Sequence, residues 1–321
     1  MAYQGRCTSA GYGKETVWGT PVARTIWLPP LLGSATLARQ VSKQQRNVHR
    51  CSGTVPVRRS HYIENDNVGG GVGHEVTYDN FGMVLEHVLG ANATTGPTAS
   101  KYTHTITLDE DVAAGLTIEL IRGTSAVSEV FEGCYANTVT LTSEAGGLMT
   151  LSLDDIIGET SATRGAAGTA TEPTSQILVK HFHAGQFNWN SVNYDIRSFS
   201  LSINNNYARR QQLGSKLTSK PERSGPIEIT CDVTLEAAEA LYSGYKDDTE
   251  SDFTLTFTDP DSSTRTIGFT GHNSFIQDYG DPISDDGVVL SNMTFRVQGD
   301  GTDHGLKIVY ENENSAVTDF G

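Results

Sequence analysis

Two segments of the chain share one order of apolar and polar positions, in which a strand pattern is followed by a helix pattern. In residues 72–79 the larger side chains occupy every second position, which is the period of a half-buried β-strand. Asp79 is then expected to cap a short helix, and Gly90 stands where a helix commonly ends. The apolar face of this helix is expected to hold Phe81, Val84, Leu85 and Val88.

The second segment repeats this order. Residues 226–233 alternate like a strand, Thr234 is the expected cap, and the helix is expected to stop near Gly244. Its apolar face is expected to hold Leu235, Ala238, Leu241, Tyr242 and Tyr245. Because the same series of elements occurs twice, the pattern predicts an internal duplication.

Strand patterns separated by turn residues follow each helix. They span 102–108, 115–121, 129–142 and 148–156 in the first half, and 252–258, 264–270, 273–279 and 288–297 in the second. Further strands are expected within 177–203 and at 306–310. The predicted fold class is therefore mainly β, with two tandem antiparallel barrel or sandwich domains, each with a short flanking helix.

The length of 321 residues favours two domains over one. We expect a first β domain at 1–158, a low-complexity bridge at 159–176, a second β domain at 177–300 and a tail at 301–321. Strands could still cross from one half to the other.

A long basic loop is expected ahead of each repeated strand. The stretch from Arg39 to Arg59 contains no acid, and the stretch from Asn205 to Gly225 contains Glu222 alone, although the whole chain has a net charge of −15. The basic residues of these two arms are Arg39, Lys43, Arg46, Arg50, Arg58, Arg59, Arg209, Arg210, Lys216, Lys220 and Arg223. Solvated loops with an ordinary charge bias are one interpretation. Cationic arms on an acidic body also suit a subunit that joins copies of itself.

Other patterns give no sign of a catalytic or metal site. The four cysteines lack metal-site spacing and are expected to be reduced thiols. His181 and His183 are expected to share a strand face without a third ligand, and the Asp259 and Asp300 segments are expected to be turns rather than calcium loops. No apolar run reaches the roughly 18–20 residues of a membrane span, so we expect a soluble protein, made in a cytoplasm.

Several motifs, in order along nearly the whole chain, resemble the tail tube (major tail) proteins of long-tailed, siphovirus-like bacteriophages. They are residues 11–22 (GYGKETVWGTPV), 27–29 (WLP), 72–90, 102–105 (YTHT), 131–134 (FEGC) and 198–206 (SFSLSINNN). The resemblance implies a non-enzymatic virion protein without a cofactor, whose β domains form stacked rings around a channel for the genome. The duplicated type of this family implies trimeric rings with pseudo-sixfold symmetry, and hexameric rings are the alternative.

The resemblance also implies the partners of the chain. These are other copies of itself, the tail tip and tail completion proteins, the tape measure protein, and double-stranded DNA that passes without tight binding, with no membrane involved. We expect the basic arms to make contacts between rings and acidic residues to line the lumen, with Glu119, Glu129, Asp252 and Asp278 as candidates. A carbohydrate- or receptor-binding β module of a viral fibre or cell surface is the alternative function.

Overall fold

The computed structural model describes residues 7–45, 61–79, 81–109, 114–123, 127–166, 170, 177–236, 238–280, 289–299 and 305–316. Strands of the first half are β1 (Cys7–Lys14), β2 (Ile26–Leu28), β3 (Ala38–Gln45), β4 (His61–Gly69), β5 (Val72–Glu75), β6 (Gly90–Thr98), β7 (Lys101–Leu108), β8 (Leu116–Arg122), β9 (Val127–Cys134), β10 (Thr138–Glu144), β11 (Thr150–Asp154) and β12 (Thr160–Ala166). Strands of the second half are β13 (Phe187–Trp189), β14 (Val192–Tyr194), β15 (Ile196–Asn204), β16 (Tyr207–Gln211), β17 (Thr218–Arg223), β18 (Glu228–Glu236), β19 (Ser251–Thr258), β20 (Thr266–Gly280), β21 (Leu290–Val297) and β22 (Leu306–Asn312).

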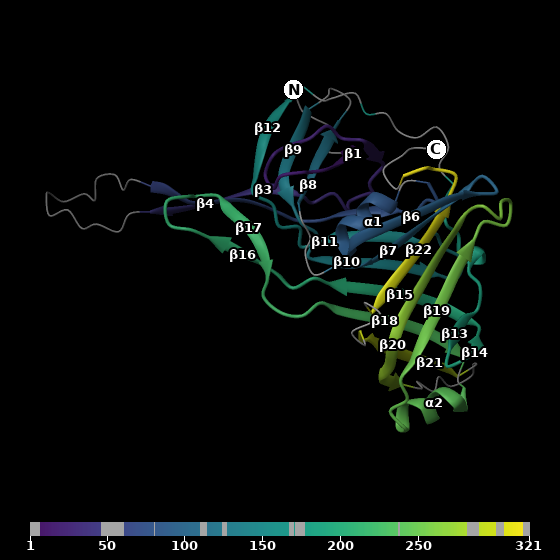
Figure 1. Cartoon of the computed structure of the whole chain (residues 1–321). Helices are drawn as coiled ribbons and strands as arrows, with labels where there is room; N and C mark the ends of the chain where they lie inside the picture. The colour runs from purple at the N-terminus through teal and green to yellow at the C-terminus, as the bar shows by residue number, and fades with distance from the viewer. Residues whose placement is uncertain are drawn as a thin grey trace, which may run out of the picture.

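The fold is mainly β and antiparallel, as the sequence predicts. Its largest sheet has thirteen strands and follows the path β14-β13-β19-β20-β21-β18-β15-β10-β11-β5 (Figure 1). β22 extends this sheet by pairing with both β20 and β7, and β7 also pairs with β6. A separate five-stranded sheet has the order β12-β9-β8-β1-β2.

The large sheet folds over so that two of its layers face each other across an aromatic core. Phe199 of β15 packs against Phe257 of β19 and Phe269 of β20, with ring centroids 6.4 and 5.5 Å apart. Phe295 of β21 packs against Phe187 of β13 at 5.3 Å. The described strands are therefore arranged as a sandwich rather than a closed barrel.

One short helix follows the repeated strand in each half, as predicted, but neither helix has the predicted cap. α1 (Gly82–Leu89) begins after Phe81 and ends at Gly90, whose φ of 106° suits a glycine. The Asp79 side chain lies near Arg265 instead, with oxygen and nitrogen 3.7 Å apart. α2 (Glu239–Lys246) begins after Ala238, because Thr234 and Leu235 still belong to β18.

The two halves are joined within the sheet by two strand pairs. β10 of the first half pairs with β15 of the second along seven residue pairs, from Thr138–Asn204 to Glu144–Ser198. β7 pairs with β22 from Thr107–Lys307 to Tyr102–Asn312. These pairs are the crossing of strands that the sequence left open.

Several element boundaries differ from the predictions. The predicted strand 129–142 is two strands, because residues 135–137 leave the ladder and Tyr135 pairs with Ile157. The predicted strands 264–270 and 273–279 are one strand, β20, in which Asn273 has a φ of 50° beside an irregularity in the ladder with β19. Residues 181–183 form a 3₁₀ turn and not a strand. The expected bridge contains β12, which pairs with β9.

Candidate assembly surfaces

The two basic arms are β-hairpins that project from the same side of the molecule (Figure 1). The first consists of β3 and β4, and the second of β16 and β17. They touch where the turn of the second hairpin meets the middle of β4: the Asp66 N–H donates to the Lys216 carbonyl at 3.0 Å, and Asp66 forms a parallel β-bridge with Leu217. The side chains of Gln211 and Asn65 are also hydrogen-bonded. Stretches about 150 residues apart in sequence thus form one structural unit.

An ion pair lies at this contact. The Arg39 guanidinium donates two hydrogen bonds to the Asp66 carboxylate, one of them 2.6 Å long, and the Asp66 side chain is only 1% exposed. The hydrogen bond from Arg39 holds the pKa of Asp66 below its usual value, and the nearby Lys216 acts in the same direction. The acid that neutralises Arg39 therefore comes from the return strand β4.

The remaining basic residues of the two arms have different surroundings. Arg210 forms an exposed ion pair with Glu222, and the Arg209 side chain lies against the backbone at Gly69 of the first arm. Arg223 donates to the Asp109 carbonyl at 3.1 Å and lies over the Tyr207 ring. Lys43, Lys216 and Lys220 have exposed side chains. Arg46, Arg50, Arg58 and Arg59 lie outside the described residues.

A second surface is the polar face of six neighbouring strands, β21, β18, β15, β10, β11 and β5. On the core side their residues are mostly apolar, whereas the opposite side carries rows of hydroxyl, amide and acidic residues in register. One row contains Glu75, Thr150, Thr142, Ser200, Asp232 and Thr294, and the next contains Ser152, Thr140, Ser202, Thr230 and Arg296. Hydrogen bonds link adjacent members, such as Thr142 Oγ1 and Thr150 Oγ1 at 2.7 Å.

This polar face is acidic. Its acids are Glu75, Glu144, Asp154, Glu228, Asp232 and Glu236, its basic residues are Arg197 and Arg296, and the six strands contain no lysine. Arg197 pairs with Glu236 and Arg296 with Glu228. Most of these acids therefore face solvent without a cation of their own on this face. We call this surface the acidic sheet face.

Of the four acids predicted for the lumen, only Asp278 is in register with the acidic sheet face, because it lies opposite Thr294 of β21 at the edge of this face. Glu119 is on β8 of the five-stranded sheet, where it is 1% exposed and paired with Arg24. Glu129 is on β9 of the same sheet, near Arg122. Asp252 on β19 and Asp278 on β20 are exposed. The alternation of Ser and Thr with apolar residues at 138–142 and 198–202 was the sequence signal for the acidic sheet face.

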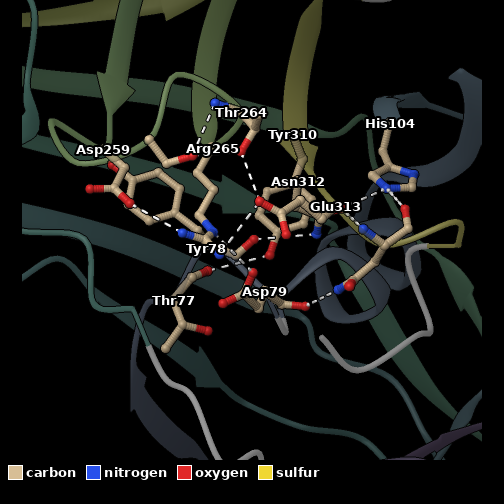
Figure 2. Close-up of polar contacts among 12 residues, drawn as sticks. Thr77, Tyr78, Asp79, His104, Asp259, Thr264, Arg265, Tyr310, Asn312 and Glu313 are labelled. Carbon is tan, nitrogen blue, oxygen red and sulfur yellow. Dashed lines mark hydrogen bonds and ion pairs between the residues drawn. The ribbon is translucent and has the colours of Figure 1, made fainter. Parts of the chain in front are cut away.

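A partly buried polar network joins the two halves (Figure 2). Arg265, just before β20, lies 3.6–3.7 Å from carboxylate oxygens of Asp79, Asp259 and Glu313. Asn312 and Asn314 donate to the carbonyls of Tyr78 and Asp79 at 3.3 and 3.1 Å. Burial raises the pKa of Asp79, and Arg265 partly offsets this. The network thus ties the C-terminal side of β22 to the segment before α1.

Three glutamates gather beside the five-stranded sheet. Glu15 accepts hydrogen bonds from the Gly133 N–H at 2.8 Å, the Thr117 hydroxyl at 2.9 Å and the Gly19 N–H at 2.9 Å. Burial, together with the charges of Glu159 and Glu15, raises the pKa of Glu132 to about 6. Burial also raises the pKa of Glu15 and Glu159. The cluster therefore takes up protons more readily than isolated glutamates do.

In the part of the chain that the structure describes, no group of three or more His, Cys, Asp or Glu residues is arranged to hold a metal ion. Among the same residues, no helix is long and apolar enough to cross a membrane. Cys134 and Cys231 are buried free thiols.

These surfaces define a structural β-protein whose distinctive features are an extended sheet face and paired arms. A family model described as phage tail tube protein matches residues 5–297. Since the match covers most of the chain, the chain belongs to the phage tail tube protein family, as its motifs had indicated. It is therefore a structural subunit of a bacteriophage tail tube and a component of the virion tail.

A comparison with curated protein sequences finds no match. Among solved structures, the hybrid NMR and cryo-EM structure of the SPP1 tail tube is similar with 8% sequence identity and a TM-score of 0.25, over 58% of this chain and 85% of that chain.

Proposed function

We propose that three copies of this chain close into a ring with pseudo-sixfold symmetry, and that rings stack into the tail tube. Support comes from the duplication: β5, α1, β6 and β7 in the first half follow the order of β18, α2, β19 and β20 in the second. Two ring units per chain require three chains where single-unit subunits would need six. The β10·β15 pairing already joins two units edge to edge within one chain.

The acidic sheet face is the proposed wall of the lumen, and it is the observation that carries the proposed function. It runs without interruption across both halves, and its charged groups are mainly carboxylates that repel DNA phosphates. Double-stranded DNA then passes without tight binding. In this proposal Asp278 stays a lumen candidate at the edge of the face, opposite Thr294, whereas Glu119, Glu129 and Asp252 lie on other surfaces.

The paired arms are proposed to reach the neighbouring ring. Their exposed cations, such as Lys43 and Lys220, would meet acidic surface there, so that charge sets the direction of stacking. The tail tip, tail completion and tape measure proteins are the proposed partners at the ends and inside the tube. We also propose that the chain is made in the host bacterial cytoplasm. It has no enzymatic activity and no cofactor in this proposal.

The test is an averaged cryo-EM cross-section of tubes assembled from purified protein. We expect three chains per ring, with β21, β18, β15, β10, β11 and β5 facing the channel. Six chains per ring, or a channel lined by lysine and arginine, would contradict the proposal.

Lysine substitutions provide a matched biochemical test of the lumen. Thr140→Lys, Ser202→Lys and Thr230→Lys together place cations across one row of the acidic sheet face, and we expect the resulting tubes to retain DNA. Thr254→Lys and Thr256→Lys alter exposed positions of β19 in the other layer of the sandwich. Tubes with these control substitutions should release DNA as the wild type does.

A further inference from the structure

The two helices occupy equivalent places in the repeat but differ in how they are covered. Seven residues of α1 are buried, whereas only Leu241 and Gly244 are buried in α2. Leu85 and Val88 are the fourth and seventh residues of α1, and both are buried. Tyr242 and Tyr245 hold the same positions in α2 and are 46% and 41% exposed.

Tyr242 and Tyr245 belong to a small aromatic face. Their rings lie 5.6 and 5.9 Å from the ring of Tyr279 on β20, measured between centroids. Tyrosine gives a large contact area at a low cost in side-chain entropy, and it is enriched at the centres of protein interfaces. We call Tyr242, Tyr245 and Tyr279 the tyrosine face.

Some of the residues that bury α1 come from the other half of the chain. Asn205 lies between β15 and the second arm, and its side-chain amide donates to the Val88 carbonyl at 3.5 Å and to the Ala136 carbonyl at 3.2 Å. The end of β15, the strand that leads into the second arm, thus lies against α1 of the first half.

The corresponding stretch ahead of the first arm is residues 31–37. It flanks β5 as β15 flanks β18, because the Leu31 N–H donates to the Gly73 carbonyl at 2.8 Å and the Thr36 N–H to the Gly71 carbonyl at 2.9 Å. This stretch presents Leu32 with 89% exposure.

We propose that the tyrosine face of one chain binds residues 31–37 of a second copy, with Leu32 against Tyr242 and Tyr245. This inference rests on the proposed ring, in which the junction between chains repeats the junction within a chain. In that arrangement α2 receives the cover that α1 already has, and Leu32 becomes buried. This apolar contact between Leu32 and the tyrosine face lies beside the sheet edges of the two copies. It determines which surface of one copy binds which surface of the next.

A charge-exchange experiment tests this pairing. Leu32→Glu and Tyr242→Lys each place an uncompensated charge in the contact, so we expect each variant to stay a folded monomer at ten times the concentration at which the wild type assembles. The double variant, Leu32→Glu with Tyr242→Lys, places opposite charges together and should assemble again, with greater sensitivity to salt. Assembly is measured by sedimentation velocity, and folding by circular dichroism.

Conservative variants are the controls. Tyr242→Phe and Leu32→Met keep the apolar contact and should assemble at the wild-type concentration. If both charged single variants assemble normally while rings form, the inference falls and the proposed function stands. If Tyr242→Lys blocks assembly and the double variant does not restore it, residues 31–37 are not the occupant. If the wild type forms no rings, the proposed function fails and this inference fails with it.

Discussion

Arg39 on β3 and Asp66 on β4 are joined by two hydrogen bonds across the first arm, and the Asp66 backbone N–H donates to the Lys216 carbonyl of the second arm. One residue thus connects the two strands of the first hairpin and joins that hairpin to the turn of the second. Because the Asp66 carboxylate is buried, its charge depends on Arg39 for compensation. The arms are therefore expected to keep their relative position only while this pair is intact.

Asp66→Asn should loosen the arms. The substitution removes the charge-assisted hydrogen bonds, and we expect the free energy of unfolding to fall by about 1–3 kcal/mol. Glu222→Gln, which breaks the exposed pair with Arg210, should cost less than about 1 kcal/mol and serves as the control. Urea unfolding measures both, and equal losses would contradict a special role for Asp66.

Reversing arm charges should block elongation without unfolding the subunit. The variant Arg58→Glu, Arg59→Glu, Arg209→Glu and Arg210→Glu is expected to give rings that do not stack, because exposed contacts each contribute about 0–1 kcal/mol and must act together. Tube length by negative-stain microscopy, measured over a range of salt concentrations, tests this. Tubes of normal length and salt sensitivity would contradict an inter-ring role for the arms.

Arg265→Gln should destabilise the junction between the halves. It leaves Asp79 and Asp259 buried without their cation, and we expect a loss of about 2 kcal/mol at neutral pH. The pKa of Asp79 is already raised, so this loss should shrink as the pH falls and the carboxylate takes up a proton. Arg197→Gln removes an exposed pair and should change stability little at either pH.

The Glu15, Glu132 and Glu159 cluster should make the protein more stable in mild acid. Glu132 has a folded pKa of about 6, above its usual 4.5, so the folded state binds more protons than the unfolded state between these values. Stability should therefore rise as the pH falls from about 7 to about 5. Below that range, protonation of Asp66, whose folded pKa is depressed, should reverse the trend.

Glu132→Gln removes the carboxylate and is the direct check on this cluster. We expect it to raise stability at pH 7–8 by on the order of 1 kcal/mol and to flatten the rise between pH 7 and 5. Thermal melting over this pH range measures the effect, with the exposed Glu250→Gln as the control. An unchanged slope in Glu132→Gln would show that other groups cause the pH dependence.

Gly271→Ala should disturb the aromatic core. A Cβ at Gly271 would overlap the Phe253 ring, whereas one at Gly268 on the same strand has its nearest neighbour at 3.5 Å. We expect Gly271→Ala to cost about 1–3 kcal/mol and Gly268→Ala to be neutral or slightly stabilising. Chemical denaturation of the pair distinguishes overpacking from a general effect of alanine in β20.

Local patterns predicted the elements well, and distant contacts explain most of the differences. The helices α1 and α2 follow from residues three and four positions apart, which is a local signal. The prediction that Asp79 caps α1 was wrong, because the Asp79 carboxylate lies beside Arg265, a residue far away in sequence. Charge counting found the arms, but it missed Asp66, because the neutralising acid lies just past the counted stretch. Contacts between residues 66 and 216 cannot be read from either segment alone.

The place of β22 has a consequence for the order of synthesis. β7 is complete by residue 108, yet its partner along one edge begins only at Leu306, roughly 200 residues later. Ribosomes release a chain from its N-terminus onwards. The edge of β7 that pairs with β22 therefore stays unpaired for most of translation. The first half therefore cannot finish its outer layer before the second half has been made. Chains interrupted before β22 keep an exposed edge that quality control can recognise, so only chains that contain β22 complete this layer before assembly.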